Sequence, residues 1–460
     1  MVQYTPPGVS FVEQIGADLS STSTGFNTTA IIGLGRSWYN VDNLELIKGS
    51  GNTDKILNPD GTDAAKGDIL AVNGIGMIPG FYNYVLNVDY TIDEDITTIT
   101  WLTDNKPAQN TSFYIKYQKN KVEADYVAMR LYGKDNIATA FGPELSGGVI
   151  NTLTLGADLV LEGAGQSAGG VVCVQAKEDT EQAYREAIDK LDTWDIQTII
   201  VLKQDSLPLR SYLIQKVKEL STSTYGKERT TFITPLIKDV TADVLAAQRE
   251  GIMSDRVTYF GNAKGITITL TDAETLEDKE VELDAIYACA NLSGIEGNPE
   301  YTFSEPMLRK QLTSRITLSQ NQLYNPLERN NLCSNYLSMF EYNENNGLTN
   351  VFDIFTTDST NVVTETRSVR RVIDLIRKNI RKQLGPRYIG QKAVETTAES
   401  AVSTTSSILS NFVSSGEIDN YRNVTGAYNK ANPKQLDISF EIKPIFELKW
   451  IKVTIATYVA

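Results

Sequence analysis

Histidine is absent from all 460 residues of this chain. Its absence excludes mechanisms that need an imidazole, whether Ser-His-Asp hydrolysis, Cys-His catalysis or a His-ligated metal. Cysteine is scarce: Cys173, Cys289 and Cys333 are odd in number and far apart in the sequence. Three such cysteines fit neither a disulfide framework nor a zinc site. We therefore expect reduced, buried thiols.

The chain also lacks an excess of positive charge and long apolar runs. It carries 43 basic and 57 acidic residues, a formal net charge of −14. Nucleic-acid binding needs a broad positive surface, so we expect no direct nucleic-acid partner. No apolar run approaches the ~18 residues of a membrane span, and the N-terminus lacks the pattern of a signal peptide. We expect the chain to fold in cytoplasm without a membrane partner.

The composition that remains is that of a globular protein with several domains. Hydrophobic residues make up 41% and charged residues 22% of the chain. At roughly 150 residues per domain, the length indicates about three domains. Residues 1–20 are predicted to form an extended arm, because Thr5-Pro6-Pro7 favours polyproline geometry. Residues 21–50 are predicted to begin a core, with a buried strand over residues 28–35.

Three further regions differ in their periodicity. Residues 51–146 alternate apolar and polar positions between turn signals, which predicts an inserted antiparallel β-rich domain with strands near 82–90, 99–101 and 113–117. Residues 147–365 alternate strands with helices, the pattern of a parallel sheet covered by helices. Residues 366–460 predict an α+β domain: helices at 369–384 and 394–413, then strands over 436–442 and 446–459. The fold class is therefore α/β plus β, with several domains.

The patterns that could bind ligands all have simpler explanations. The glycine-rich segment 163–170 precedes a strand, whereas a dinucleotide-binding loop follows a strand and opens a helix. Gly33-Leu34-Gly35 follows a strand but lacks the third glycine. The acidic clusters 93–95 and 277–280 match no calcium-loop spacing. No nucleophile has an identifiable partner base. The sequence thus predicts no enzyme activity, no cofactor and no metal site.

One helix is unusually basic for so acidic a chain. Seven cations fall within the sixteen residues from Arg367 to Lys382. They could form an ordinary solvated helix face. Alternatively, they could grip an acidic partner surface, which would make the association salt-dependent. The candidate contact residues are Arg370, Arg371, Arg377, Lys378, Arg381 and Lys382.

The two chain ends are expected to behave as strands with exposed edges. An extended arm and a long terminal strand expose unpaired backbone groups, which invite pairing with another chain. If both ends pair with neighbouring copies, strand addition links the subunits. The alternative is that both ends pair within one chain. The candidate strand-exchange residues are Pro7, Gly8, Val9, Phe11, Val12, Trp450, Ile451, Val453 and Ile455.

Several segments in a fixed order resemble one known family. Residues 4–13, YTPPGVSFVE, are similar to the N-terminal Pro-Gly-Val-Tyr-Val-x-Glu signature of contractile tail sheath proteins of phages and related injection systems. Ser10 departs from the aromatic that the family usually has. Residues 352–357 and 367–374 resemble the segment that leads into the family's C-terminal domain, and residues 438–459 resemble its closing strands.

The resemblance implies a non-enzymatic structural protein. It implies a subtilisin-like α/β core, an inserted peripheral domain and a C-terminal domain completed by both chain ends. The implied partners are copies of itself in sixfold rings, the tail tube protein, and baseplate and tail terminator proteins, in a phage tail assembled in the host cytoplasm. The implied function is to switch from an extended to a contracted lattice that drives the tube through the host envelope.

Three alternatives stay open at this point. The chain could be the sheath of a phage-derived bacteriocin or of another contractile injection system. It could be a ligand-binding α/β protein with a β-rich insertion. It could also be an adhesin assembled through strand exchange, although the N-terminus lacks the pattern of a secretion signal.

Overall fold

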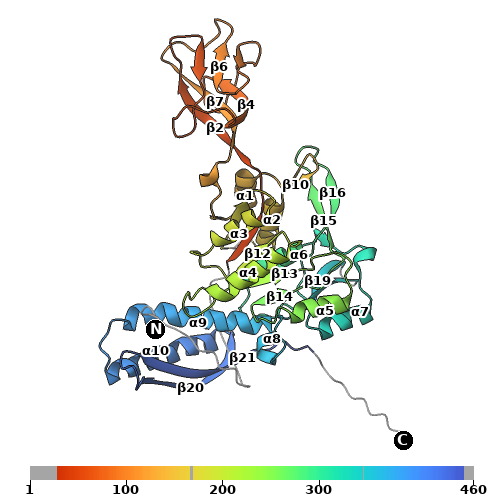
Figure 1. The fold of residues 1–460 in the computed structure, drawn as a ribbon, viewed down its shortest axis with the longest axis vertical. Helices are drawn as coiled ribbons and strands as arrows, with labels where there is room; N and C mark the ends of the chain where they lie inside the picture. The colour runs from red at the N-terminus through yellow and green to blue at the C-terminus, as the bar shows by residue number, and fades with distance from the viewer. Residues whose placement is uncertain (1–27, 166–168, 345–346, 450–460) are drawn as a thin grey trace.

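The computed structural model describes residues 28–449 apart from 166–168 and 345–346. Three parts follow one another along its longest axis (Figure 1): a β-rich domain at one end, an α/β core in the middle, and a C-terminal domain of two long helices and a hairpin at the other end. None of the helices described there has both the length and the apolar composition to span a bilayer.

A six-stranded sheet in the order β14-β13-β12-β1-β11-β8 forms the centre of the core. Five strands run parallel and β8 is an antiparallel edge. Ile31 of β1 lies opposite Cys173 on one side and Ile200 on the other. The parallel strands are almost entirely buried, as a sheet covered on both faces requires. The predicted strand and helix alternation is confirmed, with strands at β1 (Thr29–Leu34), β8 (Met129–Leu131), β11 (Val171–Ala176), β12 (Thr198–Val201), β13 (Thr230–Ile233) and β14 (Val257–Tyr259).

Helices cover both faces of this sheet. Ile31 belongs to a cluster with side chains of α2 (Thr152–Ala164) and α6 (Ile286–Gly297). Ile32 points the other way, to α3 (Glu181–Asp189) and α4 (Leu207–Leu220). The helices α5 (Ala242–Glu250) and α7 (Pro326–Ser334) pack together near β14. The alternation of strand side chains thus divides the core into two hydrophobic layers.

Smaller elements surround the core sheet. The predicted hairpin at 266–283 is present as β15 and β16, with β17 as a third strand. A second hairpin, β18–β19, lies beside β14, where Met339 packs with Val257 and Tyr259. These elements and the short remaining ones are β15 (Ile266–Thr271), β16 (Asp278–Leu283), β17 (Ile316–Thr317), β18 (Met339–Asn343), β19 (Leu348–Asp353), β9 (Leu145–Ser146), β10 (Val149–Ile150), α1 (Lys134–Phe141), η1 (Glu123–Asp125) and η2 (Gln320–Gln322).

The β-rich domain has different bounds from the predicted 51–146. Its main sheet has the order β2-β7-β4, and a second sheet has the order β3-β6-β5. The domain begins earlier, because β2 pairs along β7 with Val41 and Leu46 buried. It ends earlier, because β8 joins the core sheet. The strands are β2 (Trp38–Ile47), β3 (Thr53–Lys55), β4 (Ile69–Gly76), β5 (Tyr90–Ile92), β6 (Thr98–Trp101) and β7 (Ser112–Asn120).

Two of the three strands predicted in this domain are present. Ile99 and Trp101 are buried in β6, and Phe113, Ile115 and Tyr117 are buried in β7. The strand predicted over 82–90 is wrong, because this segment makes only isolated bridges before β5 begins at Tyr90. Its alternating aromatic and apolar residues follow the path of an irregular loop.

The C-terminal domain consists of the short helix α8 (Val362–Glu365), the helices α9 (Arg367–Tyr388) and α10 (Glu395–Ser414), and the hairpin of β20 (Ile418–Tyr428) and β21 (Leu436–Pro444). Both long helices were predicted, but β20 was missed. Its sequence is mostly polar, and a register shift near Asn423, whose φ is 55°, interrupts the alternation. Residues 445–449 form no strand. The remaining part of the strand predicted over 446–459 lies outside the described residues.

The close approach of α2 and α6 depends on two glycines. A Cβ at Gly294 would lie 2.0 Å from the carbonyl oxygen of Val160, and one at Gly163 would lie 2.1 Å from that of Asn291. We predict that Gly294→Ala lowers the free energy of unfolding by about 1–3 kcal/mol, because the two backbones must separate. Denaturant titration measures this change. Gly251→Ala is the control, because its Cβ would meet nothing closer than 3.6 Å; an equal loss in both variants would contradict the prediction.

Candidate assembly site

The basic helix α9 lies between the core and the rest of the C-terminal domain. Its apolar side, including Leu375 and Ile380, packs against Leu409 and Phe412 of α10. Phe303, from a loop of the core, enters the same hydrophobic cluster. The helix is amphipathic, as its sequence predicted, and most of the cations on its polar side contact the core. The candidate assembly site therefore consists of the α9 cations that contact the core, together with their acidic partners.

Arg367, the first residue of α9, forms a buried ion pair with Glu296 at the end of α6. Its Nε and Nη2 donate to the two carboxylate oxygens at 2.7 and 2.9 Å, and both side chains are 2% exposed. The guanidinium lies 3.9 Å from the ring centre of Phe232. Burial opposes ionisation of Glu296, but Arg367 and Arg371 outweigh it and hold the pKa of that carboxyl below its usual value.

A second buried group centres on Asp374, about two turns further along α9. Arg256 of the core donates to both carboxylate oxygens, at 2.6 and 3.0 Å. Arg370 donates to Asp374 at 2.8 Å and also to Asp255 at 2.7 Å. Burial would raise the pKa of Asp374, but Arg256 and Arg370 outweigh it and lower that pKa to about 2. The group joins α9 to the segment that precedes β14.

The remaining cations on this side of α9 also contact the core. Arg371 donates to the backbone oxygen of Glu296 at 2.6 Å, and burial lowers the pKa of Arg371. Lys378 pairs with Asp195. Arg381 donates to Glu228 at 2.7 and 3.1 Å, and Glu228 is buried. Four of the six predicted contact residues therefore bind acidic or carbonyl groups of their own chain: Arg370, Arg371, Lys378 and Arg381.

This arrangement corrects the interpretation of the helix as an exposed basic face. Arg370 and Arg371 are buried and cannot reach a partner surface in this conformation. Arg377 is half-buried and Lys382 is exposed. Of the six candidate contact residues, Lys382 is the most exposed, and Lys378 and Arg381 are partly exposed like Arg377.

A second contact joins the C-terminal domain to the core at the start of β20. The backbone N–H of Ser304 donates to the Glu417 carboxylate at 2.8 Å, and the Ser304 hydroxyl donates to the carbonyl oxygen of Gly416 at 2.7 Å. Burial raises the pKa of Glu417 to about 7, against the effect of these backbone contacts and Arg371. The two domains thus share polar contacts at both ends of their interface.

The β20–β21 hairpin has two open edges. Val424, Ile438 and Phe440 turn toward the hydrophobic cluster of α9 and α10, so one face is covered. In the described part of the chain, no other strand pairs with either outer edge. Such edges present unpaired N–H and C=O groups to an added strand. Sequence reasoning missed this candidate acceptor because it missed β20.

The predicted strand-exchange residues lie outside the described residues, so the structure does not place them. They are Pro7, Gly8, Val9, Phe11 and Val12 in the N-terminal arm and Trp450, Ile451, Val453 and Ile455 at the C-terminus.

The glycine-rich segments and the cysteines, which the sequence did not favour as ligand sites, lie in loops or in the packed core. α2 ends at Ala164, and the glycine-rich segment leads to β11, as predicted. A Cβ at Gly33 would lie 2.8 Å from the Leu202 side chain, so Gly33 permits close packing. Cys173 and Cys289 are buried free thiols, and Cys333 is half-buried. Across residues 28–449, leaving aside the gaps, no cluster of acidic residues and cysteines is arranged to hold a metal.

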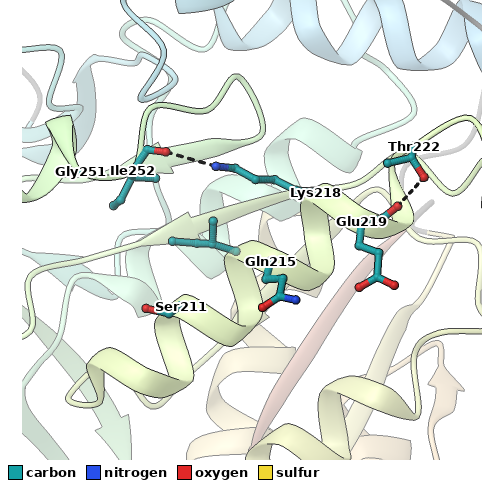
Figure 2. A pocket seen from close by; sticks show the side chains of 8 residues that line it. Ser211, Gln215, Lys218, Glu219, Thr222, Gly251 and Ile252 are labelled. Carbon is teal, nitrogen blue, oxygen red and sulfur yellow. Dashed lines mark hydrogen bonds between the residues drawn. The ribbon is translucent and has the colours of Figure 1, made fainter.

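A shallow groove of about 630 Å³ runs between α4 and the loop after α5 (Figure 2). Lys218 spans it and donates to the carbonyl oxygen of Ile252 at 3.2 Å. The Thr222 hydroxyl donates to the carbonyl oxygen of Glu219 at 2.8 Å. These contacts tie the groove's own elements together. Its polar side chains do not converge on one point, so the groove offers no arrangement for catalysis.

Comparison with known proteins adds evidence at the level of the fold. No family model and no curated protein matches the sequence. A chain in the cryo-EM structure of the anti-feeding prophage (AFP) baseplate aligns over 100% of both chains with a TM-score of 0.58 and 11% identity. The sheath tail protein of Listeria innocua aligns over 93% of this chain and 94% of its own, with a TM-score of 0.52 and 10% identity.

This chain has the fold of a tail sheath protein. The resemblance inferred from the sequence is confirmed at the level of the fold. The tail sheath fold here is a mixed α/β structure of several domains, with one mainly parallel sheet and several antiparallel ones. The predicted completion of the C-terminal domain by the two chain ends stays a prediction.

The junction of α9 with the core predicts two opposite effects of pH on stability. The folded pKa of Asp374, about 2, lies below its unfolded value of ~3.9, so its contribution is present above pH ~4 and is lost as pH falls toward 2. The folded pKa of Glu417, about 7, lies above its unfolded value of ~4.3, so its contribution is present below pH ~4 and is lost as pH rises to 7.

Calorimetric unfolding at stepped pH measures both effects. We expect Asp374→Asn to reduce the fall in Tm between pH 4 and 2, and Glu417→Gln to reduce the fall between pH 5 and 7. Each variant serves as the control for the other, because each should change only its own pH range. Profiles parallel to that of the unchanged protein would contradict the assignment.

Proposed function

We propose that this chain is the structural, non-enzymatic subunit of a contractile sheath that polymerises around an inner tail tube. The observation that carries the proposal is the likeness in fold, over the whole chain, to a chain of the AFP baseplate. That baseplate structure is sixfold symmetrised, which supports stacked sixfold rings. A phage tail, a phage-derived bacteriocin and another contractile injection system are all consistent with this likeness.

The proposed joints between subunits are strand additions. The donors are the N-terminal arm around residues 7–12 and the C-terminal arm over residues 450–460. The acceptor is the β20–β21 hairpin, whose outer edges have no partner strand in the described residues. Added strands would satisfy the exposed backbone groups on both edges. Copies linked in this way stay joined while their bodies move.

The proposed contraction is a switch between two packings of nearly rigid bodies. The buried pairs Arg367–Glu296 and Arg256–Asp374 support this, because they hold the C-terminal domain and the core as one unit. The extended lattice is metastable, and a baseplate signal releases it. Subunits then rotate outward and bury more surface against each other. No nucleotide or other cofactor enters this mechanism.

The proposed contact with the tube lies at the surface end of α9. Lys382 is exposed and Arg377 is half-buried, so both could meet a partner surface, and the buried cations of α9 hold the helix in place. Exposed ion pairs contribute about 0.2–1 kcal/mol each, which suits a contact that must break during contraction. Baseplate and tail terminator proteins would bound the polymer at its two ends. The assembled sheath would form in the host cytoplasm and belong to the tail.

Deletion of residues 1–14 tests the strand joints. We expect the purified, untagged full chain to form long hollow tubes with a helical lattice in negative-stain electron microscopy. The deletion should leave folded monomers, because the N-terminal donor strand is gone. Deletion of residues 1–3, which keeps residues 4–13, is the control and should still form tubes. Normal tubes from the longer deletion would overturn the strand-exchange mechanism.

Charge reversal tests the tube contact. We expect Arg377→Glu with Lys382→Glu to abolish most co-sedimentation with the tube protein of the same tail at low salt, because two attractions become repulsions. Lys430→Glu with Lys434→Glu, in the exposed turn of the β20–β21 hairpin, is the control with equal charge change. Unaltered binding by the α9 variant would remove these residues from the tube contact.

A further inference from the structure

The chain leaves the C-terminal domain after β21 and returns to the core. Pro444, the last residue of β21, is buried. Five residues later, the Lys449 ammonium lies 2.6 Å from the carboxylate of Asp353, the last residue of β19. The same ammonium lies 3.9 Å from the ring centre of Phe355. The side chains of Lys449 and Asp353 are each 16% exposed, so this pair is largely removed from water.

Residues 445–449 form no regular secondary structure, and side chains on both sides of Leu448 are directed toward the core. Glu447, two residues before Lys449, is turned inward, and burial raises its pKa to about 7 despite the nearby Lys449. Leu448, between them, is 74% exposed. Glu365 of α8 also faces this group, since Lys449 and Asp353 both act on its carboxylate. Lys449 thus occupies a socket formed by an aromatic ring and several carboxylates, which favours a cation.

This attachment restricts where the last eleven residues, 450–460, can go. A tail that pairs with the outer edge of its own β21 needs a turn of about two to five residues directly after Pro444. The residues available for that turn are 445–449. Because Glu447 and Lys449 hold this segment on the core, it cannot form the turn. The tail then has to start its path from the core surface.

We propose that Lys449, Asp353 and Phe355 form a clasp that fixes where the C-terminal arm leaves the body. The clasp keeps the arm from closing onto its own hairpin and reserves it for the hairpin of a neighbouring copy. The proposal rests on the proposed function, because a neighbouring hairpin exists only in the polymer. Lys449, Asp353 and Phe355 act as positioning residues and take no part in the strand joint itself.

Hydrogen exchange on the dilute monomer tests the clasp without requiring assembly. In Lys449→Ala, residues 445–449 become free to turn, and the arm should cover the edge of its own β21. We expect the β21 amides to exchange about tenfold more slowly than in the unchanged protein. Asp353→Asn should have the same effect, because it removes the charge that holds Lys449. It also provides a second variant if Lys449→Ala fails to fold.

Lys443→Ala is the matched control. Lys443 also lies near the end of β21 and also pairs with an acidic residue, Asp419, but both side chains are about half exposed. We expect the β21 amides of Lys443→Ala to exchange hydrogen as fast as those of the unchanged protein. Unchanged exchange in both Lys449→Ala and Asp353→Asn, with folding verified by circular dichroism, would overturn the clasp.

Electron microscopy of the same variants separates this result from the proposed function. Tubes from the unchanged protein and Lys443→Ala, with fewer from Lys449→Ala, support both proposals. Equal tubes from all variants would overturn the clasp and leave the sheath proposal in place. Slower β21 exchange in Lys449→Ala, with no tubes from any variant even beside the tube protein, would support the clasp's restraint on the arm and overturn the sheath proposal.

Discussion

The buried ion pair between Arg367 and Glu296 is the contact on which the C-terminal half of the structure depends. Two charges that are 2% exposed are tolerated only because each satisfies the other in a bidentate geometry and the guanidinium also contacts Phe232. Removing one partner would leave a buried charge, at a cost of about 3–5 kcal/mol. The pair therefore fixes the first turn of α9 against α6, and the direction of α9 places α10 and the hairpin.

The mechanical character of the subunit follows from this arrangement. Along α9, the pairs centred on Asp374 and Glu228 repeat the attachment, so the C-terminal domain and the core move together. The β-rich domain is attached differently, since the chain enters it just before Trp38 and leaves it just after Asn120. In the proposed contraction, a subunit built in this way would transmit rotation through its core and C-terminal domain. The β-rich domain can vary without disturbing that path.

The periodicity of the sequence was enough to predict helices and strands that are fully buried or that contact segments nearby in the sequence. The buried strand around Ile31 and the alternating helices and strands that follow it are examples. The basic helix was placed correctly but its buried ion pairs were not predicted, because Glu296 and Asp255 precede their arginines by 71 and 115 residues and no local pattern reveals such pairings. β20 was missed because a strand covered on one side and interrupted at Asn423 has no clear alternation. The terminal arms lie outside the described residues.

In the proposed sheath, the β20–β21 hairpin links folding to assembly. A two-stranded sheet is marginal in water, and this one is supported by α10 on a single face while its edges stay open. In the proposed polymer, strands added at those edges would supply backbone hydrogen bonds that the isolated subunit lacks, so the hairpin would gain its full stability only there. The net charge of −14 keeps separate copies apart. The proposed assembly would then require specific strand addition at a defined edge, which is the selectivity that an ordered helical lattice needs.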